Sequence, residues 1–201
     1  RYILFAAASL AFIITIKETY IMTFAVYALS LAIAYGYEIV FLPKGARFQH
    51  FKDVFATFAI DFKKNKYSIG ISIGVFLLIN FLFYSSFFTY YAGIKGILTT
   101  LKIWSKTGVH IGGHAKPFIY YFKVLYKFEL PILVLGIAGF YYAFRRGNKF
   151  SVFVSLWAIL MYVIYSLIPY KTPWLILNIV LPFTILAGIF VNGIFGIVKK
   201  R

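Results

Sequence analysis

Long apolar stretches separated by short basic ones constrain this chain more than any other feature. Of its 201 residues, 62% are hydrophobic and only 13% are charged, far from the composition of an ordinary soluble domain. About 20 apolar residues are enough for a helix to cross the hydrocarbon core of a bilayer. The stretches are continuous and lack the alternation of a lipid-facing barrel. We therefore expect an all-α polytopic membrane protein in which residues 1–201 form a single transmembrane domain.

Six apolar stretches are expected to be membrane-spanning helices: residues 3–16, 20–42, 69–88, 131–144, 150–167 and 174–198. Two further segments have the spacing of amphipathic helices that lie in the membrane interface. In the first, phenylalanines recur at gaps of three and four residues, at Phe48, Phe51, Phe55, Phe58 and Phe62. The second covers residues 90–106, where lysines lie opposite an apolar face. The chain opens at Arg1 without a methionine, so we expect a piece of a longer protein.

The distribution of charge predicts a topology. The formal net charge is +16, but the basic residues fall in blocks between apolar runs, which favours contact with anionic lipid headgroups over nucleic acid. We assume that alternate connections lie on the same side of the membrane. One side then holds 13 Lys and Arg, including all five arginines, and comprises Arg1, loops 43–67 and 145–149 and the C-terminus. The other side holds 8 Lys and Arg. The positive-inside rule makes the first side cytoplasmic and places loops 89–128 and 168–173 outside. We expect an integral protein of a prokaryotic plasma membrane.

One turn, residues 166–174, holds a lysine between two prolines and two apolar runs, with the sequence Ser-Leu-Ile-Pro-Tyr-Lys-Thr-Pro-Trp. Pro169 and Pro173 should end the adjoining helices, because each removes a backbone donor and disfavours helix in the residue before it. A lysine there must lie at a water boundary or in a polar cavity. Tyr170 and Trp174 are expected at the lipid interface. Since the prolines hold Lys171 in place, we favour a functional role for it over simple anchoring.

Among the basic residues on the predicted outer face, five are candidate site residues: Lys17, His110, His114, Lys116 and Lys171. Lysine offers a point charge to phosphate oxygens, and glycine-rich turns let backbone donors approach them. We interpret the set as contacts for a lipid phosphate, although basic residues beside spans often serve only as anchors. Two glycines separate the histidines, so the helical spacing of a metal site does not apply. No metal or other cofactor is predicted.

The catalytic residue is left unassigned. Glu18 directly follows Lys17, and the two could form an interfacial ion pair. Alternatively, Glu18 could orient Lys17 or act as a base, but one carboxylate without a partner is a weak indication of acid–base chemistry.

Three strings in this order resemble a known family: Lys17-Glu18-Thr19-Tyr20, then Lys116-Pro117-Phe118-Ile119-Tyr120-Tyr121 followed by Phe128-Glu129-Leu130-Pro131, then Pro169-Tyr170-Lys171-Thr172-Pro173-Trp174-Leu175. They look like the flippase activity-associated proteins. That polytopic family is similar to the dolichyl-phosphate-mannose protein mannosyltransferases, which have the C-type glycosyltransferase fold. The last string is the most specific. The resemblance covers nearly the whole chain, but only the later part of a full-length member.

The resemblance implies a mannosyltransferase-like membrane enzyme that passes a sugar from a polyprenyl-phosphate donor to an acceptor at the outer face. In that fold the catalytic acid usually lies in the first outward loop, which would precede this chain. The expected partners are the polyprenyl-phosphate sugar and membrane lipid, with no nucleic acid. The alternative is a non-catalytic flippase or transport component that handles lipid-linked sugars, so whether the protein is an enzyme is left open.

Overall fold

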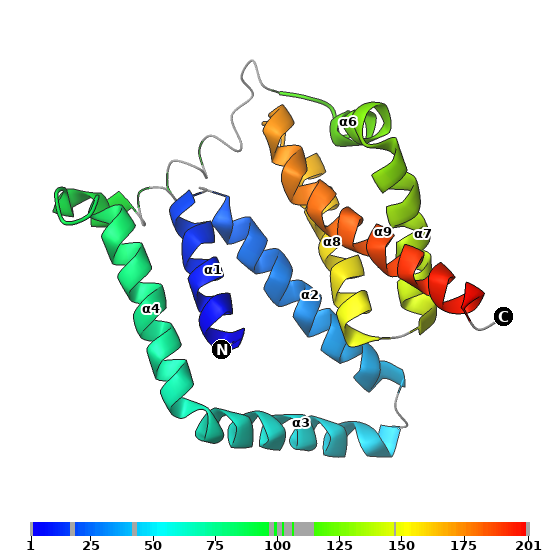
Figure 1. Cartoon of the computed structure of the whole chain (residues 1–201), viewed down its shortest axis with the longest axis horizontal. Coiled ribbons are helices and arrows are strands. Elements are labelled where there is room, and N and C mark those ends of the chain that lie inside the picture. The colour runs from blue at the N-terminus through cyan, green and yellow to red at the C-terminus, as the bar shows by residue number, and fades with distance from the viewer. Residues whose placement is uncertain are drawn as a thin grey trace. The chain divides into compact units, whose positions relative to one another are not determined.

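The computed structural model describes residues 2–16, 19–41, 44–96, 99, 102, 106, 115–146 and 148–199, which are helical and contain no strand. The α-helices are α1 (Tyr2–Ile16), α2 (Tyr20–Phe41), α3 (Lys44–Lys64), α4 (Lys66–Tyr84), α6 (Tyr120–Phe128), α7 (Leu130–Arg146), α8 (Lys149–Leu167) and α9 (Leu177–Val198). Two 3-10 turns are η1 (Tyr91–Lys95) and η2 (Pro173–Ile176) (Figure 1). The prediction of an all-α chain is confirmed for these residues.

The helices belong to two compact units. The first combines Arg1–Ile21 with Ile39–Lys106, and the second combines Met22–Glu38 with Thr107–Arg201. Each unit is described by itself below.

Among the described residues, three helices are long and apolar enough to cross a membrane: Lys66–Tyr84, Lys149–Leu167 and Pro173–Gly196. A fourth candidate arises if α6 and α7, which are bent by 110° at their junction, form one broken span. The apolar helices Tyr2–Ile16 and Tyr20–Gly36 are shorter. The helices are therefore consistent with an integral membrane protein of three or four spans, and the six expected spans stay a prediction.

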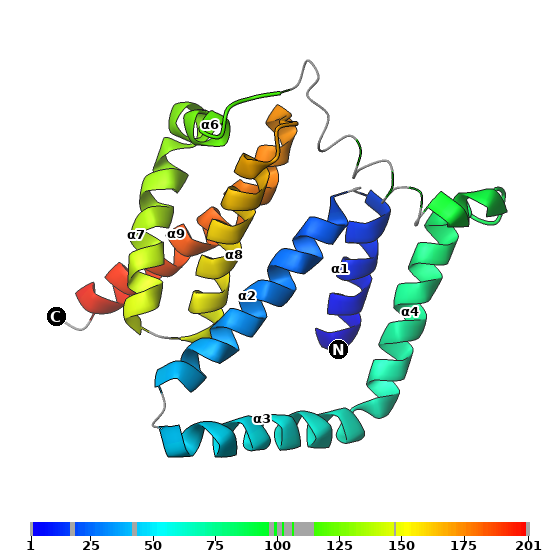
Figure 2. The same cartoon turned by 180° about the vertical axis from the view of Figure 1, so that it is seen from behind.

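In the first unit, α1 lies along α4. Both views show α3 lying across the N-terminal end of α4 (Figures 1 and 2). The Phe12 and Phe83 rings meet edge to face with centroids 5.6 Å apart. The Tyr84 hydroxyl donates to the Ile14 carbonyl at 3.2 Å. The second predicted amphipathic segment begins at η1, and most of its residues lie outside the described part of the chain.

The α4 helix ends at Tyr84, four residues before the end predicted for this span. Ser86, Phe87 and Phe88 all have positive φ angles (48°, 55° and 68°), which reverse the chain. The reversal is held by Ser85, whose Oγ accepts from the Phe88 N–H at 3.1 Å and whose carbonyl accepts from the Tyr90 N–H at 2.8 Å. Apolarity alone predicted a longer helix, because the turn contains the apolar residues Phe87 and Phe88.

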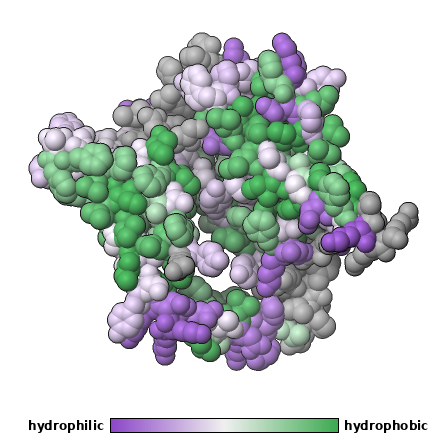
Figure 3. Space-filling model, in the orientation of Figure 1, coloured by the Kyte–Doolittle hydropathy of each residue, from purple (hydrophilic) through white to green (hydrophobic). Residues whose placement is uncertain are grey.

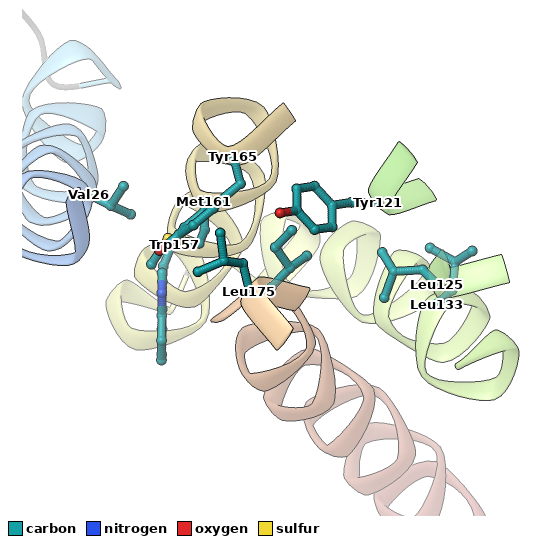
Figure 4. Packing of buried hydrophobic residues seen from close by; sticks show 9 residues of the cluster. Val26, Tyr121, Leu125, Leu133, Trp157, Met161, Tyr165 and Leu175 are labelled. Carbon is teal, nitrogen blue, oxygen red and sulfur yellow. The ribbon is translucent and has the colours of Figure 1, made fainter. Parts of the chain in front are cut away.

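The core of the second unit gathers side chains from α2, α6, α7, α8, η2 and α9 (Figure 4). Its fully buried members include Val26, Tyr121, Leu125 and Ile179. The bend between α6 and α7 follows from Pro131, which has no N–H to continue the helical ladder. Asn148 caps α8, since its side chain accepts from the Phe150 N–H at 3.0 Å.

Two glycines let α7 approach α9 backbone to backbone. A Cβ added at Gly139 would lie 2.0 Å from the Leu186 carbonyl oxygen and 2.5 Å from its carbon. One added at Gly136 would lie 2.7 Å from the Phe183 ring. Small residues serve this purpose between membrane helices, where dispersion replaces the hydrophobic effect as the packing force.

We expect Gly139→Ala to lower the stability of the second unit by about 1–3 kcal/mol, because backbone atoms cannot move aside as a flexible side chain can. Gly188→Ala is the matched control on α9, since a Cβ there meets nothing within 4 Å. Alanine also favours helix over glycine by about 1 kcal/mol, so the control should be neutral or stabilising. Unfolding in detergent micelles measures both, and equal effects would contradict the close contact.

Candidate functional site

The candidate site lies where the chain turns from α8 into η2 and α9. Ile168 (φ −71°, ψ 125°) and Thr172 (φ −118°, ψ 146°) are extended, as expected for residues that precede proline. The α8 helix accordingly ends at Leu167, and Pro173 opens η2. These features confirm the predicted ends of the two helices. They hold Lys171 in a short extended segment between Pro169 and Pro173.

This turn pairs with the segment that leads into α6. Ala115 and Tyr170 form an isolated antiparallel bridge, and the Lys116 N–H donates to the Pro169 carbonyl at 3.1 Å. On the other side of Lys171, the buried Tyr121 hydroxyl donates to the Thr172 carbonyl at 3.2 Å. Segments more than 50 residues apart in the sequence are therefore joined at two points, the bridge with its Lys116–Pro169 hydrogen bond and the Tyr121–Thr172 hydrogen bond.

The Lys171 side chain adds two more hydrogen bonds and is buried, with 2% of its surface exposed. Its Nζ donates to the Lys116 carbonyl at 3.1 Å and to the Ile168 carbonyl at 2.5 Å. Each carbonyl carries only a partial negative charge. None of the described carboxylates, which are Asp53, Asp61 and Glu129, forms an ion pair with it. Burial lowers the pKa of Lys171 from its ordinary value.

Further polar groups surround the turn. The Asn178 side-chain amide donates to the Tyr165 hydroxyl at 3.0 Å. The hydroxyls of Ser166 and Thr172 are buried and have no hydrogen-bond partner among the described residues. An unsatisfied buried hydroxyl costs free energy, so both groups could accept or donate a further hydrogen bond at no additional desolvation cost.

The structure brings Lys116 and Lys171 together, as the sequence predicted for the same face, but in different environments. Lys116 is exposed, whereas Lys171 points its ammonium group at backbone carbonyls. Tyr170 is partly buried in the same turn, and Trp174 is 60% exposed, as suits an interfacial anchor. The other predicted site residues, Lys17, Glu18, His110 and His114, lie outside the described residues.

Sequence reasoning missed Tyr121, Tyr165 and Asn178 as parts of the site. Tyr121 could have been found, because it closes the string that begins at Lys116. Asn178, one turn into an apolar span, carries a similar signal. Nothing in the sequence predicted that Asn178 and Tyr165 form a hydrogen bond with each other.

The arrangement is suited to binding an anion. A buried ammonium without a carboxylate partner raises the local electrostatic potential, and an anion held nearby would offset the cost of its desolvation. The exposed Lys116 can contact such an anion directly, because its own backbone is held at both N–H and C=O. The described residues contain no group of three or more His, Cys, Asp or Glu that could hold a metal ion.

Comparison of the chain with protein-family models, with curated proteins and with solved structures gave no match.

The lowered pKa of Lys171 predicts a pH-dependent contribution to stability. Between that lowered pKa and the ordinary value of 10.5, the unfolded chain binds more protons than the folded chain, so the free energy of unfolding should rise with pH. Lys171→Gln should flatten this rise, while Lys123→Gln, at an exposed lysine of α6, should preserve it. Unfolding in micelles from about pH 8 to pH 11 measures the slopes, and the same slope in all three proteins would refute the prediction.

Proposed function

We propose that this chain is part of a membrane glycosyltransferase that uses a polyprenyl-phosphate sugar as donor. The observation that supports it is the pairing of the turn around Lys171 with the segment at Lys116. These are two of the three strings on which the resemblance to the flippase activity-associated proteins rests. The two strings lie far apart in the sequence, and the resemblance rests on their residues alone, without their contact. Their meeting places two lysines in one small region, as a phosphate site requires.

In this proposal the exposed Lys116 contacts the donor phosphate, and the buried Lys171 contributes its charge and holds the Lys116 backbone. His110, His114 and Lys17 stay predicted phosphate contacts, because they lie outside the described residues. Tyr170 and Trp174 place the site at the level of the lipid headgroups, where the phosphate of a polyprenyl lipid lies. The sugar and its acceptor would then approach from the outer face, with six spans and a cytoplasmic arginine-rich side as the full topology.

The second candidate is a non-catalytic component that binds or hands over lipid-linked sugars. It is favoured by the absence of a carboxylate from the described part of the site, because sugar transfer requires a base for the acceptor hydroxyl. Both candidates use the same phosphate contact and differ only in chemistry.

Binding of labelled polyprenyl phosphate to the reconstituted chain tests the shared step. Lys116→Gln should weaken binding about 10- to 100-fold, the equivalent of one charge-assisted hydrogen bond of about 1.5–3 kcal/mol. Lys116→Arg should keep most of the affinity, and Lys123→Gln serves as the control at another exposed lysine. Parent affinity in Lys116→Gln would exclude this site.

A transfer assay with polyprenyl-phosphate sugar then separates the two candidates. If the protein is an enzyme, polyprenyl phosphate should be released only when an acceptor is present. This release should fall in Lys116→Gln together with binding. The carrier predicts binding with the sugar–phosphate bond left intact.

A further inference from the structure

The α3 helix presents an unusual face. Its five phenylalanines, Phe48, Phe51, Phe55, Phe58 and Phe62, are each between 51% and 68% exposed. At 100° per residue they fall within an arc of about 80°. Ile60 is 66% exposed but lies nearly opposite the centre of this arc. The helix therefore offers one continuous aromatic face, which we call the Phe face.

The position of α3 within its unit suggests what covers the Phe face. The helix is joined through Asn65 to α4, which is long and apolar enough to cross a membrane, and it lies across the end of α4 (Figures 1 and 2). With 19 residues, α4 is about 28 Å long, close to the thickness of the hydrocarbon core. If α4 crosses the bilayer, α3 lies along its surface.

The opposite end of α4 supports this orientation. The reversed turn after Tyr84 exposes Phe87, Phe88, Tyr90 and Tyr91 by 51–63%. Aromatic residues of this kind concentrate where hydrocarbon meets water. One end of α4 therefore has an aromatic turn and the other has α3, which places each end at a membrane interface.

The charge of α3 indicates which lipid it meets. The helix contains five basic and two acidic residues, a net charge of +3, and ends in Lys63 and Lys64. In Figure 3 hydrophilic side chains gather along α3, whereas hydrophobic ones cover α4. Lysines beside an apolar face can extend to headgroup phosphates while their stems stay in the apolar region. The Lys52 ammonium already lies 4.5 Å from the Phe48 ring.

We propose that α3 is a lipid-binding helix whose Phe face inserts into a leaflet rich in anionic headgroups. Its flanking lysines pair with the lipid phosphates, and insertion fixes the depth of α4 in the bilayer. This role is independent of the proposed sugar chemistry, because it concerns the first unit alone.

Single labels test the proposal cleanly, because the chain has no cysteine. Phe58→Cys and Ile60→Cys, at equally exposed positions on opposite faces, are labelled with a nitroxide in the reconstituted full chain. In phosphatidylcholine vesicles with about one third phosphatidylglycerol, we expect the label at 58 to collide mainly with oxygen and the label at 60 mainly with a water-soluble nickel complex. Equal accessibility to nickel at both positions would overturn the insertion.

The lipid preference is tested with the same labels. Removing phosphatidylglycerol, or introducing Lys52→Gln with Lys63→Gln at the two lysines that flank the Phe face, should raise the exposure of the label at 58 to nickel, and added salt should act in the same direction. The control variant Lys123→Gln with Lys127→Gln removes the same charge from α6 and should leave the nickel accessibility of the label at 58 unchanged. Identical accessibility with and without the anionic lipid would overturn the preference.

Discussion

The second unit depends on one buried ammonium group. Lys171 donates to carbonyls of its own turn and of the segment before α6, so a single side chain joins two stretches that are also held by one bridge and, among the described residues, by the hydrogen bond from Tyr121 to Thr172. Burying a charge is costly unless its hydrogen bonds are satisfied. The prolines on either side reduce the cost of ordering the turn, because they restrict its conformations before folding. The lysine can therefore be retained inside a largely apolar bundle.

The same residue shows why a buried charge has implications beyond stability. An ammonium whose partners among the described residues are carbonyl dipoles keeps most of its positive potential, whereas one paired with a carboxylate does not. Lys116, held on the surface above it, extends this potential to the solvent. The pair thus differs from exposed lysines such as Lys63 and Lys123, because one of its two lysines is buried. This difference is the physical basis for treating the turn as a binding site.

The sequence predicted the helices well where strong local signals end them. Pro169 and Pro173 marked the turn between α8 and η2, and the phenylalanine spacing marked α3. It failed at Ser85, because the turn that begins there contains Phe87 and Phe88, whose apolarity resembles that of a continued span. It also could not reveal that Lys171 is enclosed: its acceptor on Lys116 is a backbone carbonyl 55 residues away, and a carbonyl carries no sequence signature. The remaining site residues, including His110 and Glu18, stay predictions.

The close approach of α7 and α9 has a consequence for how the second unit can move. At Gly139, which lies against the Leu186 carbonyl, the two helices touch through rigid main chain. Neither helix can rotate about its own axis without lifting off the other, since a neighbouring, larger residue would enter the contact. Any rearrangement within the second unit must therefore carry α7 and α9 together as one body.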